Sequence, residues 1–146
     1  MVTHHSILLI DDSPGECELF RLALAQTGLD VTLFTEQDAE AALHFFEDRA
    51  HHSPLPTLML LDLHLRSQDG CDLLKQLRAD ARLACVPVVI FTTSDDQQDL
   101  ARCHAAGANG YVVKPGTFAE LIQCIADICR YWLNRNRVSH TVGTPC

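Results

Sequence analysis

The sequence predicts an α/β protein with three layers, in which helices cover both faces of a doubly wound, five-stranded parallel sheet. Short apolar runs alternate with longer amphipathic segments along most of the chain. Four of the five runs are nearly continuous in Ile, Leu, Val and Phe, which is typical of strands buried on both faces. Regular strand–helix alternation implies parallel strands joined by right-handed crossovers.

The predicted strands are five short segments. The second is more mixed in polarity and suits an edge of the sheet. In chain order, the strands are expected at Ser6–Ile10, Asp30–Phe34, Leu58–Leu61, Val86–Phe91 and Gly110–Val113.

Helix start and stop signals lie between these strands. Gly28 and Gly107 are expected to end the first and fourth helices, and the last helix is expected to run to about Asn134. The helices are predicted to begin after Ser13, Thr35, the Asp69-Gly70 turn, Ser94 and Thr117.

Length and charge limit the possible functions. The 146 residues carry 11 Lys plus Arg against 19 Asp plus Glu, which gives a net charge of −8. We expect one domain over residues 1–134 and a short flexible tail over 135–146, with no room for a separate output domain. The acidic balance argues against nucleic acid as the main partner. No apolar run approaches the ~18 residues of a membrane span, so we expect a cytoplasmic protein without a membrane partner.

Polar residues follow four of the predicted strands. Asp11 and Asp12 end the first run, Asp62 the third, Thr92 the fourth and Lys114 the fifth. In parallel sheets, ligands bind beyond the carboxyl ends of the strands. Converging carboxylates either share protons or bind a hard cation such as Mg²⁺. Together with a lysine and a hydroxyl group, they have the chemistry needed for phosphoryl transfer to a carboxylate.

Other interpretations of these residues exist. Taken singly, an Asp at a strand end is more often a turn or cap residue, and Lys114 before a proline could be a solvated loop residue. Four strand ends with complementary chemistry favour a site. Two other functions remain open, a haloacid-dehalogenase-like phosphatase and a phosphorylation-independent adaptor. The phosphatase needs a second Asp where His64 stands. A dinucleotide-binding domain is poorly supported, because no G-x-G-x-x-G motif follows the first strand.

Ordered motifs from about Ser6 to Asn134 resemble the receiver domain of two-component response regulators. This resemblance implies a flavodoxin-like strand order 2-1-3-4-5. The motifs are Ile7-Leu8-Leu9-Ile10-Asp11-Asp12, Leu60-Leu61-Asp62-Leu63-His64-Leu65 with Asp69-Gly70, Pro87-Val88-Val89-Ile90-Phe91-Thr92, and Gly107-Ala108-Asn109-Gly110-Tyr111-Val112-Val113-Lys114-Pro115.

The resemblance also implies roles for the site residues. Asp62 is the expected phosphoacceptor, phosphorylated by a histidine kinase or by a small phosphodonor. Mg²⁺ is expected between Asp11, Asp12, Asp62 and the backbone carbonyl of His64. The protein would promote only its own phosphorylation and dephosphorylation.

Two further residues complete the implied mechanism. Thr92 and Lys114 would hold the phosphoryl group, and Tyr111 would change rotamer when Thr92 moves. The family pattern also implies a cis Lys114–Pro115 peptide bond.

Thr92-Thr93-Ser94 and Tyr131-Trp132-Leu133 resemble a narrower group, the single-domain regulators that partner bacterial phytochrome kinases. This implies a red-light receptor as the kinase and a homodimeric regulator.

Two positions near the phosphoryl site are expected to tune the dephosphorylation rate. His64 and Ser94 each lie two residues beyond a phosphate-contacting position. His64 is equally compatible with a solvated loop residue. The family usually has Pro where Arg66 stands, so we expect a looser loop after Asp62.

The last predicted helix has a wide apolar arc. Leu121, Ile125, Ile128 and Trp132 form the expected core stripe. A second stripe, Ile122, Cys129 and Leu133, is predicted to form a dimer face together with the neighbouring helix, Asp95–Ala106. The alternative is a buried helix edge covered by the tail.

Overall fold

A computed structural model describes residues 4–48 and 54–135 of the chain. Strands and helices alternate along these residues. A short 3₁₀ helix follows the third α-helix, and a π-helical segment follows the fifth. The elements are β1 His5–Ile10, α1 Pro14–Gln26, β2 Val31–Glu36, α2 Ala39–Asp48, β3 Leu58–Leu61, α3 Gly70–Ala79, η1 Ala81–Leu83, β4 Val88–Thr92, α4 Gln97–Ala106, β5 Gly110–Val113, α5 Phe118–Cys129 and η2 Arg130–Arg135.

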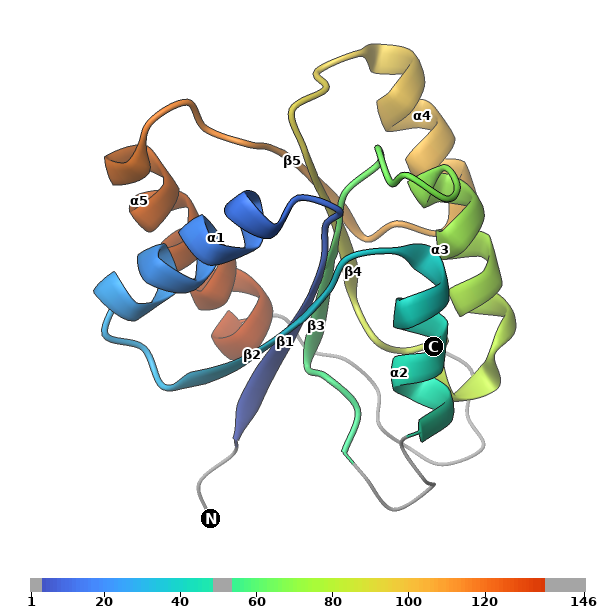
Figure 1. Ribbon diagram of the computed structural model, residues 1–146, viewed down its shortest axis with the longest axis horizontal. Helices are drawn as coiled ribbons and strands as arrows, with labels where there is room; N and C mark the ends of the chain where they lie inside the picture. Colours follow the sequence, from blue (N-terminus) through green and yellow to red (C-terminus); the bar gives the residue numbers. More distant parts are fainter. Residues whose placement is uncertain (1–3, 49–53, 136–146) are drawn as a thin grey trace.

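The five strands form one parallel sheet in the order β2-β1-β3-β4-β5. Helices α1 and α5 cover one face, and α2, α3 and α4 cover the other (Figure 1). This confirms the predicted three-layer architecture and strand order. Ile10, at the end of β1, is level with Leu61 at the end of β3, so the residues that follow both strands meet at one sheet edge.

Burial follows the sheet order. Every residue of β3 has no exposed surface, and β4 is buried throughout. Most of β2 and β5 is partly buried, which confirms that the more polar second run lies at an edge. The helix-covered centre of the sheet explains why the inner strands are continuous in apolar residues.

Three helix starts follow the sequence signals and two differ. The side chains of Ser13, Asp69 and Thr117 cap α1, α3 and α5. Thr35 belongs to β2, and the Asp38 carboxylate instead accepts a 2.7 Å hydrogen bond from Ala41 N in the first turn of α2. Asp96, rather than Ser94, caps α4. In both cases an Asp stands closer to the first helical turn, and its carboxylate accepts a hydrogen bond from a backbone N–H group of that turn.

The last helix corrects the predicted dimer face. Helix α5 continues into η2, as expected, but Cys129 and Leu133 are buried at 1% and 9% exposure. Both belong to the cluster between the sheet and α1, and Ile122 packs partly buried against it. The second apolar stripe is therefore interior, because α5 packs on α1 as well as on the sheet.

The Lys114–Pro115 bond is trans, and no cis peptide bond occurs among the described residues, so the cis prediction is wrong. The trans form is the intrinsically favoured isomer of an X–Pro bond. Apart from Arg135, the expected tail lies outside the described residues. In the part of the chain that the structure describes, no helix is long and apolar enough to span a membrane.

Candidate functional site

The sheet brings the predicted site residues together at one edge. The backbone pairing continues just past the strands and fixes where these residues stand. Asp11 N donates to Glu36 O at 3.0 Å, Asp62 N to Ile10 O at 2.9 Å and Lys114 N to Thr92 O at 2.7 Å. Asp11, Asp62 and Lys114 are thus fixed through their own main chains.

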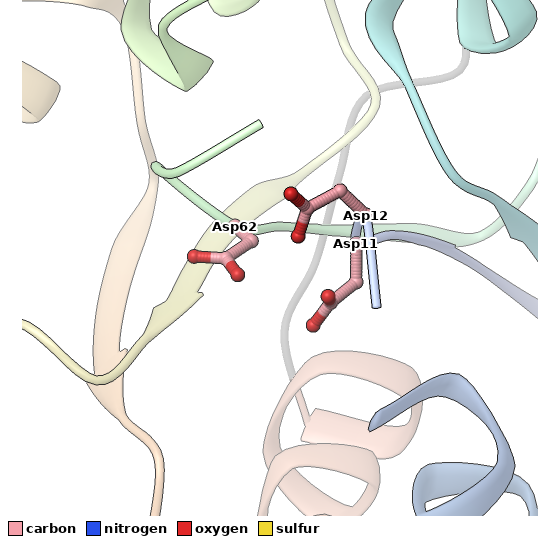
Figure 2. Close-up of side chains that lie close together, drawn as sticks. All are labelled: Asp11, Asp12 and Asp62. Atoms are coloured by element: carbon pink, nitrogen blue, oxygen red, sulfur yellow. The ribbon is translucent and has the colours of Figure 1, made fainter. Parts of the chain in front are cut away.

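Three carboxylates gather where β1 and β3 end (Figure 2). Asp11, Asp12 and Asp62 each offer an oxygen atom, and these oxygens lie within 4.8 Å of one another. Asp11 and Asp62 are buried, and Asp12 is partly exposed. Few protein oxygens around a partly open position suit Mg²⁺, which retains several water ligands. The residues present therefore fit a hard divalent cation.

One buried lysine contacts two of these carboxylates, and the exposed Arg66 lies 3.9 Å from the third, Asp12. Lys114 Nζ donates to Asp11 Oδ2 at 2.7 Å and to Asp62 Oδ2 at 3.3 Å. Glu16 Oε2 lies 3.9 Å from the same nitrogen. Burial, the largest single influence, lowers the pKa of Lys114, but the hydrogen bond to Asp11 and the nearby negative charges outweigh it. The pKa of Lys114 is therefore raised above its ordinary value, and the side chain is charged at neutral pH.

The other oxygen of each buried carboxylate contacts nearby backbone. Asp11 Oδ1 accepts from Ser13 N at 3.0 Å, and Asp62 Oδ1 accepts from His64 N at 3.3 Å. With Lys114 on the remaining oxygens, both carboxylates are held from two sides. The geometry of the site is therefore largely fixed by the fold.

The loop after Asp62 folds back tightly on itself. Gly70 N donates to Leu63 O at 2.8 Å, and a β-bridge joins His64 to Asp69. A Cβ atom at Gly70 would lie 2.4 Å from the Asp62 carbonyl oxygen, so a side chain there requires a backbone shift. This close approach explains the glycine of the Asp69-Gly70 pair, and the looser loop expected from Arg66 stays a prediction.

Thr92, Ser94 and Tyr111 are linked beside the carboxylates. Thr92 is fully buried, and its Oγ1 accepts a 3.4 Å contact from Ser94 N. The Tyr111 hydroxyl donates to Ser94 O at 2.8 Å, and burial raises the pKa of Tyr111. The loop between β4 and α4 is thus joined to both residues that were predicted to switch.

Sequence reasoning missed three participants around the site. Glu16 approaches Lys114 from α1, while Asp99 and Arg102 of α4 bond to Ser94 and to the loop after Asp62. Their types and spacing are those of ordinary exposed helix residues. No signal in a single sequence distinguishes them from a solvated helix face.

The doubly wound sheet, the carboxylate cluster and the buried lysine define a class, the α/β domains with an acidic, cation-type site at the carboxyl edge of a parallel sheet. Comparison with known proteins identifies the family. Residues 7–126 match the model of the response regulator receiver domain, and the chain belongs to this family. The match confirms the resemblance inferred from the motifs and leaves the phosphatase alternative without support. Receiver domains bind Mg²⁺ or Mn²⁺ at an acidic site and act as signalling proteins.

Several known proteins are similar over most of their length. The probable methanogenesis regulatory protein FilR2 of Methanothrix harundinacea is 35% identical over 90% of this chain and 85% of its own. Response regulator Rcp1 of Synechocystis is 31% identical over 87% of this chain and 88% of its own.

Solved structures agree with these matches. The phosphorylated cyanobacterial phytochrome response regulator RcpA superposes with a TM-score of 0.83 at 27% identity, over 93% of this chain and 99% of that one. The Mn²⁺-bound form of Rcp1 gives a TM-score of 0.79 at 29% identity, over 92% and 99% of the two chains. The predicted likeness to phytochrome response regulators is confirmed.

The buried lysine gives a first prediction. We expect Lys114→Met to lower the free energy of unfolding at pH 7 by about 3 kcal/mol, because it leaves buried carboxylates without their cation. The pKa of Lys114 is higher in the folded state than in the unfolded state. Its contribution to the free energy of unfolding is therefore fully present below the unfolded-state pKa of about 10.4, and it is lost as the pH rises through the folded-state pKa. Urea unfolding between pH 7 and pH 11 measures this difference.

The matched control is Lys75→Met, which changes the chain's one other lysine, an exposed residue of α3. We expect the control to unfold like the wild type at every pH. Equal stabilities for Lys114→Met and the wild type at pH 7 would contradict this account of Lys114.

Proposed function

We propose that the protein takes up a phosphoryl group on Asp62 from a histidine kinase and signals through its own protein-binding surface. The observation that carries this proposal is the contact of Lys114 with both Asp11 and Asp62 at the three-carboxylate cluster. A nucleophilic carboxylate, a cation site and a fixed ammonium group are the parts that phosphoryl transfer requires.

Mg²⁺ would be held by Asp11, Asp12, Asp62 and the backbone carbonyl of His64. When bound, it would neutralise charge on the phosphoryl oxygens. An oxygen of Asp62 attacks phosphorus in line as the bond from phosphorus to the kinase histidine nitrogen breaks. Lys114, already on Asp62 Oδ2, is placed to contact a phosphoryl oxygen. The Thr92 hydroxyl would donate a hydrogen bond to another.

The same residues suggest how phosphorylation of Asp62 would change the surface of the protein. Movement of Thr92 toward the phosphoryl group would carry the loop between β4 and α4, because Ser94 N contacts Thr92 Oγ1. Tyr111 would then lose its acceptor on Ser94 and change rotamer. Such a two-state rearrangement alters the surface formed by α4, β5 and α5.

A phytochrome-type kinase is the partner that the comparisons favour. Rcp1 and RcpA, which resemble this chain along nearly their whole length, are response regulators, and RcpA is named as a phytochrome response regulator. A protein phosphorylated by such a kinase would act in the cytoplasm. The net charge of −8 also favours a protein partner over nucleic acid.

Phosphoacceptor identity is tested with a small phosphodonor. We expect acetyl phosphate with Mg²⁺ to add one phosphoryl group to the wild type, seen by intact mass, and none to Asp62→Asn. Asp72→Asn, which alters an exposed carboxylate of α3, should be labelled like the wild type. Labelling of Asp62→Asn at another residue would overturn the assignment, as would a wild type that stays unlabelled.

Phosphoryl lifetime is tested at two positions. His64 is exposed, and Ser94 is bonded to Asp99 through its hydroxyl group. Since both flank the phosphoryl position, we expect His64→Ala and Ser94→Ala each to change the dephosphorylation rate roughly two- to tenfold by altering access of the attacking water. Loss of the phosphorylated mass with time, after removal of the phosphodonor, measures the rate. Lifetimes equal to the wild type in both variants would contradict these roles.

We also propose that the protein forms a homodimer through α4 and α5, with η2 beside them. The stripe predicted for this face is buried, but Tyr131 of η2 is 55% exposed. We expect sedimentation to give a dimer mass that Tyr131→Glu lowers toward the monomer. Leu22→Glu, an exposed site on α1, is the control and should leave the mass unchanged. A monomer mass for the wild type, with and without phosphorylation, would contradict the dimer.

A further inference from the structure

A line of polar contacts runs outside the carboxylate cluster, along the seam between α3 and α4. It begins at Asp69, in the loop that follows Asp62, and ends at Tyr111 on β5. We call it the seam chain, and it consists of Asp69, Arg102, Asp99, Ser94 and Tyr111. Its members come from four separate segments of the chain, so it joins parts of the domain that the sheet alone does not connect.

Arg102 is the centre of the seam chain. Its Nη1 donates to Asp69 Oδ1 at 2.7 Å, and its Nη2 donates to Asp99 Oδ1 at 3.3 Å. The two bonds use different nitrogens of one planar guanidinium group, so a single side chain links the two carboxylates in a fixed geometry. Arg102 lowers the pKa of Asp69, chiefly through their hydrogen bond, so both partners carry charge at neutral pH.

One end of the seam chain fixes the loop after Asp62. The same Asp69 oxygen that meets Arg102 also accepts from Cys71 N at 2.8 Å and thereby caps α3. Asp69 is bridged to His64, and Gly70 lies against the Asp62 carbonyl. Arg102 therefore contacts a loop that packs directly against the backbone of Asp62.

The other end fixes the loop between β4 and α4. Asp99 Oδ2 accepts the Ser94 hydroxyl at 2.6 Å, and this bond is the main reason for the lowered pKa of Asp99. Ser94 in turn accepts the Tyr111 hydroxyl and contacts Thr92 through its amide. Any displacement of Thr92 that carries Ser94 along must strain or break the bond to Asp99.

We propose that Arg102 is a positioning residue that holds the loop between β4 and α4 in its unphosphorylated arrangement and so slows phosphoryl uptake at Asp62. This inference rests on the proposed function. Arg102 acts through Asp99 and Ser94. Its hydrogen bond to Asp69 links Asp99 to the loop that follows Asp62. Weakening the seam chain lowers the cost of moving Thr92 toward the phosphoryl group.

The test measures the labelling rate with acetyl phosphate and Mg²⁺. Partly exposed charge pairs contribute modestly, so we expect Arg102→Ala to be labelled about two- to fivefold faster than the wild type. Ser94→Ala, which removes the other bond to Asp99, should accelerate labelling similarly. Because both changes break one chain, the double variant should be no faster than the faster single variant.

A matched control shows whether the effect depends on the place of Arg102 in the seam chain or follows from the loss of any exposed ion pair. Arg130, the first residue of η2, pairs with Asp127 of α5 at 3.4 Å and i,i+3 spacing, as Arg102 pairs with Asp99 at 3.3 Å on α4. Arg130→Ala should therefore be labelled at the wild-type rate.

A spectroscopic signal distinguishes repositioning from general loosening. The chain has two tyrosines, Tyr111 and Tyr131, so fluorotyrosine labelling gives two ¹⁹F signals that Tyr111→Phe assigns. In Arg102→Ala without phosphodonor, the Tyr111 signal should move toward its position in the beryllofluoride-treated wild type. The Tyr131 signal should not move.

Two outcomes overturn the inference while leaving the proposed function intact. One is a wild type labelled at Asp62 with Arg102→Ala labelled equally fast or more slowly. The other is additive acceleration in the double variant. Failure of the proposed function is distinct, because the wild type itself would then remain unlabelled.

Discussion

One buried ammonium group is the interaction on which the site depends. Lys114 stands at the end of β5 and reaches carboxylates at the ends of β1 and β3, so it joins three strands that are not neighbours in sequence. Without a cation between them, Asp11 and Asp62 would repel in surroundings that water screens poorly. The lysine therefore makes it possible for two carboxylates to be buried side by side. It also leaves the cluster short of positive charge, which favours a further cation.

The charge balance shows why a metal ion suits this site. Asp11, Asp12 and Asp62 bring three negative charges, Lys114 brings one buried positive charge, and the exposed Arg66 lies 3.9 Å from Asp12. Phosphorylation would consume the charge of Asp62 and add a group of about −1.5 to −2. Lysine alone cannot offset that increase, whereas a divalent ion between the carboxylates and the phosphoryl oxygens can. Three of the negative charges that contribute to the net charge of −8 therefore lie at this site.

The fold and the centre of the site were predictable because their signals are local or periodic. Buried strands are recognisable from continuous apolar runs, and parallel pairing places their carboxyl ends at one edge. Asp62 and Lys114 were found in this way. The errors arose where tertiary contacts decide between local alternatives. Asp38 and Asp96 cap helices that Thr35 and Ser94 were expected to cap. The second stripe of α5 is interior because α1 packs on it, and periodicity alone does not distinguish that neighbour from a second copy.

The seam chain shows why the rest of the site could not be predicted from a single sequence. Arg102 and Asp99 lie one turn apart on α4, a spacing that ordinarily marks a weak surface pair. Their importance comes from Asp69, a residue 33 positions from Arg102, which the packing of α3 against α4 brings within 2.7 Å. The sheet holds the reacting groups rigidly, so what can adjust is the loop after β4. Contacts on that loop, rather than more residues at the carboxylates, are therefore where the proposed control of phosphoryl uptake by this chain lies.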